Sequence, residues 1–150
     1  MPRVSILTPL YKSREEHLRE TIESVLAQTF QDFELLLLND SPDDDARLRS
    51  IVAEYQDARI RYMCNAENLG ISASRNKLIE AASGDYLAVL DHDDLMLPER
   101  LRLQVEYLDA HPDVGVVGSM IEYFPGGKRP ALPVDDDDLR LNLMFRTVHT

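Results

Sequence analysis

The spacing of apolar residues is what most constrains the fold of this chain. Three apolar runs, at Val4–Thr8, Phe33–Leu38 and Tyr86–Leu90, have the length of β-strands. Between the first two, residues 15–28 place apolar side chains three or four positions apart, which is the spacing of one helical face. Strands joined by helical crossovers build a parallel sheet. The sequence therefore predicts an α/β protein with a mostly parallel central sheet.

The strands are expected to differ in their place within the sheet. The apolar run Phe33–Leu38 predicts a strand buried on both faces, whereas the alternating polarity of Arg59–Cys64 predicts an edge strand. The other expected elements are helices over 43–55, from an N-cap at Ser72 to Gly84, from Pro98 to Leu108 and over 135–145, a strand over 114–117, and a hairpin that begins at 120–124.

Length, charge and cysteine content limit the possible functions. A chain of 150 residues with 44% hydrophobic residues can bury one core, so residues 1–150 are expected to form a single domain. The net charge of −11 argues against nucleic acid or an anionic membrane as partner. No apolar run approaches the roughly 20 residues of a membrane span. A single cysteine, Cys64, and the lack of an apolar leader predict a cytoplasmic setting.

Polar and aromatic residues gather where the first two predicted strands end. The carboxyl ends of parallel strands meet at one edge of a sheet, where such proteins bind ligands. Pro9 and Tyr11 offer a rigid turn and an aromatic ring for a base, although a plain entry to the next helix would look the same. Asp40 can accept a hydrogen bond from a ring N–H or cap the following helix.

A glycine turn followed by an arginine lies at Asn68–Asn76. Ser72, Ser74 and Arg75 fall in the first turns of the predicted helix. Backbone N–H groups, the positive end of a helix dipole and a guanidinium are what a diphosphate needs. Ordinary helix capping explains the glycine and the serines equally well, so this prediction depends on Arg75.

The acidic segment Asp91–Asp94 is the most specific signal. Three carboxylates in four residues repel one another unless a cation or a sugar hydroxyl lies between them. Carboxylate oxygens suit Mg²⁺ or Mn²⁺, which neutralise a departing diphosphate. The alternative is that these acids cap the next helix. His92 is expected to be a surface or packing residue, and a second acidic run, Asp135–Asp138, a solvated helix start without function.

Taken together, these segments resemble the nucleotide-binding part of an inverting family-2 glycosyltransferase. The resembling stretches are VSILTPLYK (4–12), TIESVLAQTFQDFELLLLNDSPDD (21–44), NLGISASRN (68–76), GDYLAVLDHDDLMLPERL (84–101) and HPDVGVVGS (111–119). The resemblance implies the GT-A fold, a Rossmann-like three-layer α/β/α arrangement. It also implies sugar transfer from a nucleoside-diphosphate sugar to an acceptor hydroxyl with inversion. A UDP-sugar is the favoured donor, ahead of dTDP or GDP donors.

The resemblance assigns nucleotide contacts to individual residues. Pro9, Tyr11 and Asp40 are expected to contact the base and the ribose, and Arg75 the diphosphate or the base. Lys12 departs from the asparagine that the family often has after this tyrosine, so its role stays open.

The DXD motif that the resemblance implies falls on Asp91–Asp93. Asp93 is expected to be the principal ligand of Mn²⁺ or Mg²⁺, Asp91 to touch the ribose or the sugar, and Asp94 to assist either. The general base of the family is expected beyond Thr150, because inversion needs a group that deprotonates the acceptor. The chain is thus expected to be a truncated, donor-binding portion whose exposed apolar surface favours association between copies.

The acceptor and two other functions stay open on the sequence. The acceptor would be a polysaccharide, a lipid-linked molecule that brings the full protein to the membrane, or a protein. One alternative function is a non-catalytic module that binds nucleotide and metal. The other is a metal-dependent phosphohydrolase with Asp91 as nucleophile, which is disfavoured because Leu95 and Met96 follow where a hydroxyl residue is expected. A nucleotidyltransferase ranks below sugar transfer, because residues 8–14 lack glycine.

Overall fold

A parallel sheet of four strands organises the computed structural model, which describes residues 1–123. The strands are β1 (Val4–Leu10), β2 (Phe33–Asn39), β3 (Ile60–Cys64) and β4 (Tyr86–Val89), in the order β3-β2-β1-β4. Every pair is parallel, with Val4 beside Phe33 and Tyr86 in the register of β1. The central strands β1 and β2 are buried at every position, and β3 lies at an edge, as the sequence predicted.

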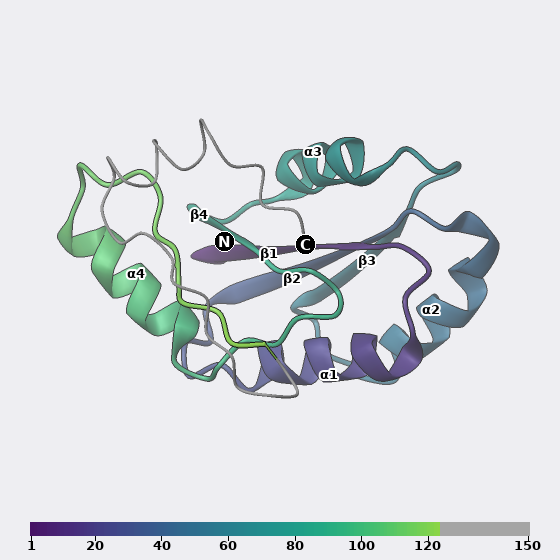
Figure 1. Ribbon diagram of the computed structural model, residues 1–150, viewed down its shortest axis with the longest axis horizontal. Helices are drawn as coiled ribbons and strands as arrows, with labels where there is room; N and C mark the ends of the chain where they lie inside the picture. Colours follow the sequence, from purple (N-terminus) through teal and green to yellow (C-terminus); the bar gives the residue numbers. More distant parts are fainter. Residues whose placement is uncertain (124–150) are drawn as a thin grey trace. The chain divides into compact units, whose positions relative to one another are not determined.

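Helices cover both faces of this sheet, which gives the three layers expected (Figure 1). The helices are α1 (Glu15–Leu26), α2 (Asp45–Ala53), α3 (Ile71–Ala81) and α4 (Arg100–Ala110), with a short 3₁₀ turn, η1 (Pro42–Asp44), before α2. Helices α1, α2 and α4 share one apolar core with the first face of the sheet. Helix α3 packs through Leu78 against Leu7, Leu36 and Leu38 on the other face.

The order of the strands places a switch point between β1 and β4. The chain runs outward from β1 to β2 and β3, and then returns through α3 to pair β4 with the free side of β1. The loops after β1 and β4 therefore leave the same sheet edge in different directions. A crevice at such a point is where open α/β sheets bind ligands.

A buried carboxylate lies at the opposite, amino-terminal edge of the sheet. Glu34 Oε1 accepts hydrogen bonds from the hydroxyls of Ser5 and Ser83, each at 2.7 Å, and from the Ser83 N–H at 2.8 Å. Arg61 donates to Oε2 at 2.8 Å. Burial alone would raise the pKa of Glu34, but these hydrogen bonds outweigh it and lower the pKa to about 2. The chain needs glycine at Gly84, because a Cβ there would lie 2.6 Å from the Ser5 nitrogen.

Several predicted boundaries differ from the structure. Gly70, not Ser72, is the N-cap of α3, and α3 ends at Ala81, before Gly84. Helix α4 begins at Arg100, after a turn that contains Pro98. A strand was predicted over residues 114–117, but these residues have no regular secondary structure.

Other predictions fall on parts of the chain that have to be treated separately. The chain divides into two compact units, Met1–Gly115 and Val116–Thr150. All the helices and strands named above lie in the first unit. Most of the predicted hairpin after Met120, and the helix over 135–145, lie outside the described residues. Among residues 1–123, none of the helices combines the length and the apolar character needed to cross a membrane.

Candidate nucleotide-sugar site

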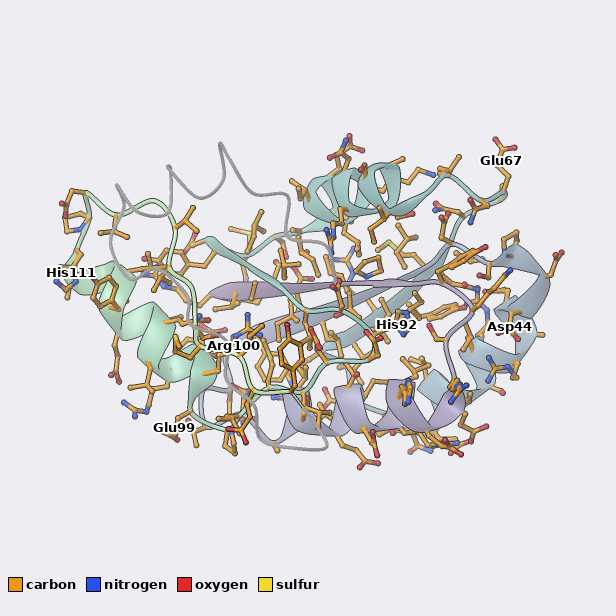
Figure 2. All side chains as sticks on the ribbon, viewed as in Figure 1. Asp44, Glu67, His92, Glu99, Arg100 and His111 are labelled. Carbon is orange, nitrogen blue, oxygen red and sulfur yellow. The ribbon has the colours of Figure 1, made fainter. Side chains whose placement is uncertain are left out.

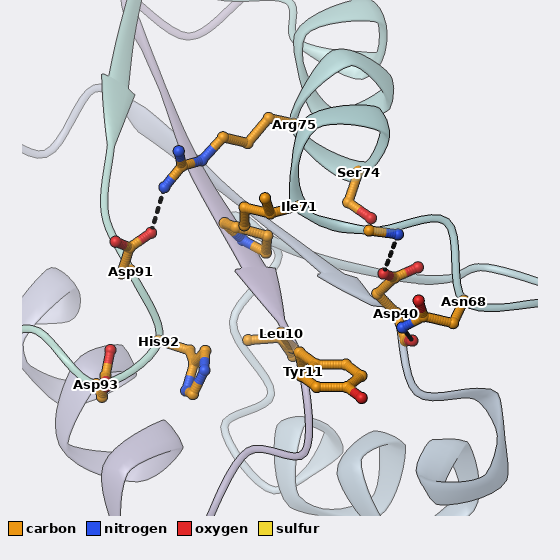
Figure 3. Close-up of a pocket in the computed structure, with 12 residues that line it drawn as sticks. Leu10, Tyr11, Asp40, Asn68, Ile71, Ser74, Arg75, Asp91, His92 and Asp93 are labelled. Atoms are coloured by element: carbon orange, nitrogen blue, oxygen red, sulfur yellow. Dashed lines mark hydrogen bonds and ion pairs between the residues drawn. The ribbon is translucent and has the colours of Figure 1, made fainter. Parts of the chain in front are cut away.

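The four loops singled out in the sequence meet around one pocket at the carboxyl edge of the sheet (Figure 3). The pocket has a volume of about 410 Å³. It is lined by Pro9, Leu10, Tyr11, Asp40, Asn68, Gly70, Ile71, Ser74, Arg75, Asp91, His92 and Asp93. Every predicted site residue except Asp94 is therefore brought to the same cavity.

Asp40 is held by the loop that precedes α3. Its carboxylate accepts hydrogen bonds from the Asn65 side chain at 2.7 Å and from the N–H groups of Leu69 and Gly70 at 2.9 and 2.8 Å. Burial alone would raise the pKa of Asp40, but these hydrogen bonds lower it, so the group is anionic at neutral pH. Two carboxylate oxygens offer about four acceptor positions. Asp40 thus shapes the loop and keeps limited capacity for a ligand N–H.

The N-terminus of α3 opens onto the pocket because Gly70 adopts a left-handed conformation. Its φ is +82°, which side chains with a Cβ rarely adopt. Ser74, one turn later, is fully buried, and its hydroxyl accepts a hydrogen bond from Asn65 at 3.1 Å. The same asparagine therefore ties Ser74 to Asp40. This arrangement sets the direction in which the next residue, Arg75, leaves the helix.

Arg75 reaches across the pocket to the end of β4. Its guanidinium lies 2.7 Å from Asp91 Oδ1, and both side chains are about half exposed (Figure 3). The Nε of Arg75 is buried and has no hydrogen-bond partner within the described part of the chain. A buried donor without a partner is costly. Arg75 can therefore gain from a ligand oxygen while it remains close to Asp91.

The other wall of the pocket is apolar and aromatic. Tyr11 and Ile71 stand about half exposed, while Leu10 is buried at the end of β1. Lys12 does not line the cavity. Its ammonium lies 5.2 Å from the centre of the Tyr11 ring, and its backbone N–H donates to the Ser41 hydroxyl at 2.9 Å. A flat base can stack on such a surface. Lys12 therefore has no place in the wall of the pocket, and its role stays open.

The carboxylates of the acidic loop, Asp91–Asp94, differ in whether they line the pocket. Asp91 and Asp93 line the pocket and Asp94 does not. Partial burial, with the charges of Asp93 and Asp91, raises the pKa of Asp94, and Arg100 at the start of α4 offsets part of this effect (Figure 2). His92 also lines the pocket, with a buried Nδ1 that has no partner among residues 1–123. Its position in the pocket wall is compatible with the surface or packing residue expected.

A divalent cation fits this donor set only together with oxygens from a ligand. Among the residues that the structure describes, no group of three or more His, Cys, Asp or Glu side chains is arranged to hold a metal ion. Mg²⁺ is commonly bound through one or two carboxylates plus substrate phosphates. The exposed carboxylate of Asp93 next to the pocket suits that mode.

The sequence did not reveal several residues that form the wall of the site or support it. Leu10 and Ile71 form part of its wall. Thr21 on α1 is buried and bonded to the acidic loop, and Gln28, two residues beyond the end of α1, is buried and bonded to Leu97. For Thr21 the available signal was position, because it adjoins Ile22 on the buried side of the helix.

Comparison with known proteins settles the family. The model of glycosyl transferase family 2 matches residues 5–147. The chain belongs to glycosyltransferase family 2. Over 125 residues it is 40% identical to the uncharacterized glycosyltransferase MJ1057 of Methanocaldococcus jannaschii. This match covers 82% of the present chain and 42% of MJ1057. Membership of this family favours sugar transfer over phosphate hydrolysis.

Solved structures confirm the GT-A fold of this family member. TarS of S. aureus in complex with UDP superposes with a TM-score of 0.65 at 24% identity, over 73% of this chain and 33% of that one. The mannosyltransferase PcManGT of Pyrobaculum calidifontis, in complex with GDP-Man and Mn²⁺, superposes with a TM-score of 0.65 at 23% identity. This match covers 76% of the present chain and 34% of PcManGT. The chain spans less than half the length of the curated relatives it matches.

Proposed function

We propose that this glycosyltransferase binds a nucleoside-diphosphate sugar, with UDP-sugars favoured, and transfers the sugar to an acceptor hydroxyl with inversion. The observation that carries the proposal is the single pocket that joins an aromatic wall, a guanidinium and carboxylates at the switch point of the sheet. Support also comes from the TarS complex with UDP and the PcManGT complex with GDP-Man and Mn²⁺.

In this proposal the pocket binds the nucleotide from its two walls. Pro9 and Tyr11 contact the base, and Asp40 accepts a hydrogen bond from a ring N–H with the capacity that its own loop leaves free. Arg75 donates to the diphosphate, since its Nε lacks a partner within the described chain. The positive end of α3 lies on the same side of the pocket, where Gly70 and Ser74 line it.

The acidic loop completes the leaving-group side. Asp91 contacts the ribose or the sugar, and Asp93, assisted by Asp94, holds Mn²⁺ or Mg²⁺. A bound divalent cation would supply Lewis-acid stabilisation of the charge on the departing diphosphate. The general base that deprotonates the acceptor is, in this proposal, supplied by a part of the protein beyond Thr150. The acceptor itself is left open.

Calorimetric titration of UDP, dTDP and GDP, each with and without Mn²⁺, tests this function. We expect UDP to bind most tightly and Mn²⁺ to strengthen its binding, because the cation would join the Asp93 carboxylate to the phosphate oxygens. In Asp93→Asn the effect of Mn²⁺ should disappear while metal-free binding persists. Equal UDP affinity with and without Mn²⁺ in the wild type would contradict the metal-assisted mechanism.

A further inference from the structure

Helix α1 and the turn after it carry a row of three polar side chains that bond to the acidic loop and to the residues that follow it. Thr21 and Ser24 lie three residues apart on α1, so they share one side of the helix, and Gln28 lies two residues beyond its last residue, Leu26. Thr21 has no exposed surface and Gln28 is 1% exposed. Buried polar side chains of this kind are retained only where they are hydrogen-bonded. All three are bonded to residues 92–101.

Thr21 is the member of this row that reaches the carboxylate segment itself. Its hydroxyl lies 2.9 Å from the carbonyl oxygen of His92 and 3.0 Å from that of Asp94. A hydroxyl has one proton to donate, so the two carbonyls share it. They are the carbonyls on either side of Asp93. The backbone is thereby held toward α1 at both flanks of Asp93, while the Asp93 side chain lines the pocket.

The other two side chains hold a later part of the loop. Ser24 Oγ accepts the Met96 N–H at 3.2 Å. Gln28 donates to the Leu97 carbonyl at 2.8 Å and accepts the Leu101 N–H at 3.1 Å. These contacts fix the path from the loop into α4. Thr21 therefore has a separate task from Ser24 and Gln28.

The carboxylates themselves oppose the arrangement that Thr21 holds. Asp91 and Asp93 lie close enough for their charges to act on Asp94. Like charges at such short range repel one another when no cation lies between them. A tether on the uncharged backbone counters this repulsion without neutralising the carboxylates, which stay available to a ligand.

We infer that Thr21 is a positioning residue that orients the Asp93 carboxylate for a nucleotide-bound divalent cation, through the carbonyls of His92 and Asp94. The inference rests on the proposed function for the role of Asp93. Thr21 touches neither substrate nor metal. Its effect is exerted through the backbone of the loop.

The test compares Thr21→Val, which keeps the shape and removes the hydroxyl, with Thr21→Ser, which keeps the hydroxyl. Thr29→Val is the matched control, because the Thr29 N–H still bonds the Pro98 carbonyl at 2.9 Å when the hydroxyl is lost. Each protein is titrated with MnCl₂ in the presence of saturating UDP. Hydrogen exchange of residues 90–97 is followed by mass spectrometry without ligand, and urea unfolding verifies that each variant is folded.

We expect Thr21→Val to weaken Mn²⁺ binding roughly tenfold, the scale on which groups behind metal ligands act, and to speed exchange of the loop. Thr21→Ser and Thr29→Val should stay near the wild type in both measurements. Unchanged Mn²⁺ affinity or unchanged loop exchange in Thr21→Val would overturn the inference, as would equal losses in Thr21→Val and Thr21→Ser. Failure of the wild type to bind UDP with Mn²⁺ would instead defeat the proposed function, and loop exchange would still decide whether Thr21 holds the loop.

Discussion

The two ends of the sheet use carboxylates in opposite ways. At the amino end, Glu34 is 6% exposed and is surrounded by donors from Ser5, Ser83 and Arg61. At the carboxyl end, the Asp91–Asp94 loop gathers partly or fully exposed carboxylates, and among residues 1–123 only Asp91 of this loop has an ion-pair partner, Arg75 at 2.7 Å. A satisfied carboxylate stabilises the fold, whereas a crowded and exposed group favours a ligand that supplies positive charge. The contrast separates the stabilising end from the binding end.

Removing the Glu34 carboxylate should have the largest effect on stability. Glu34→Ala leaves the buried hydroxyl of Ser5, the donors of Ser83 and the half-exposed charge of Arg61 without their acceptor. We expect the free energy of unfolding to fall by about 3 kcal/mol, the upper end of what an unsatisfied buried donor costs. Urea denaturation measures this value. The exposed Glu80 on α3 gives the control, because Glu80→Ala should change stability by less than about 0.5 kcal/mol.

Acid should abolish the contribution of Glu34. The pKa of Glu34 is lowered to about 2 in the folded protein, from 4.5 without the fold. A lowered pKa means that the stabilisation is present above about pH 4.5 and is lost as the pH falls toward about 2. The shift corresponds to about 3 kcal/mol. Urea unfolding of the wild type and Glu34→Gln should therefore converge between these pH values; a constant gap between the two curves would show that the charge of Glu34 is not the source.

Neutralising a residue of the acidic loop should have a small effect of opposite sign. The pKa of Asp94 is raised by partial burial and by Asp93 and Asp91, so its charge disfavours the folded state at neutral pH. Solvent screens exposed charges, and Asp94→Asn should raise the free energy of unfolding by at most about 0.5 kcal/mol. Asp45→Asn is the matched control and should lower stability, because it removes a negative charge that pairs with Arg49 at 3.2 Å in the first turn of α2. Destabilisation by Asp94→Asn would remove the distinction between the two ends.

The sequence predicted the sheet well because its signals are local to each strand. The apolar run of β2 indicated its central place, and the mixed polarity of β3 indicated an edge. The strand expected over 114–117 was wrong, because β-branched residues mark a strand only where another strand can pair with them. The start of α3 was placed at Ser72 because serine is a common N-cap, whereas the left-handed turn at Gly70 begins it.

The site was predictable where chemistry follows the end of a strand, and not where packing decides. Tyr11, Asp40 and Asp91 stand at strand ends and line the pocket as expected. The hydrogen bonds that Asp40 makes to its own loop required the path of residues 65–70 in space. The contact between Thr21 and the acidic loop joins residues 71 positions apart, which no local pattern reveals.

Paramagnetic broadening by Mn²⁺ tests the central claim most directly, because it reports where on the sheet the cation binds. The ends of the seven-residue strand β1 lie roughly 20 Å apart. In ¹⁵N-labelled protein with UDP, substoichiometric Mn²⁺ should broaden the amide signals of Asp91–Asp94, Gly70 and Arg75, and leave those of Ser83 and Gly84 beside Glu34 sharp. In Asp93→Asn this selective broadening should vanish. Broadening centred on Ser83 and Gly84, or the same pattern in Asp93→Asn, would contradict the account.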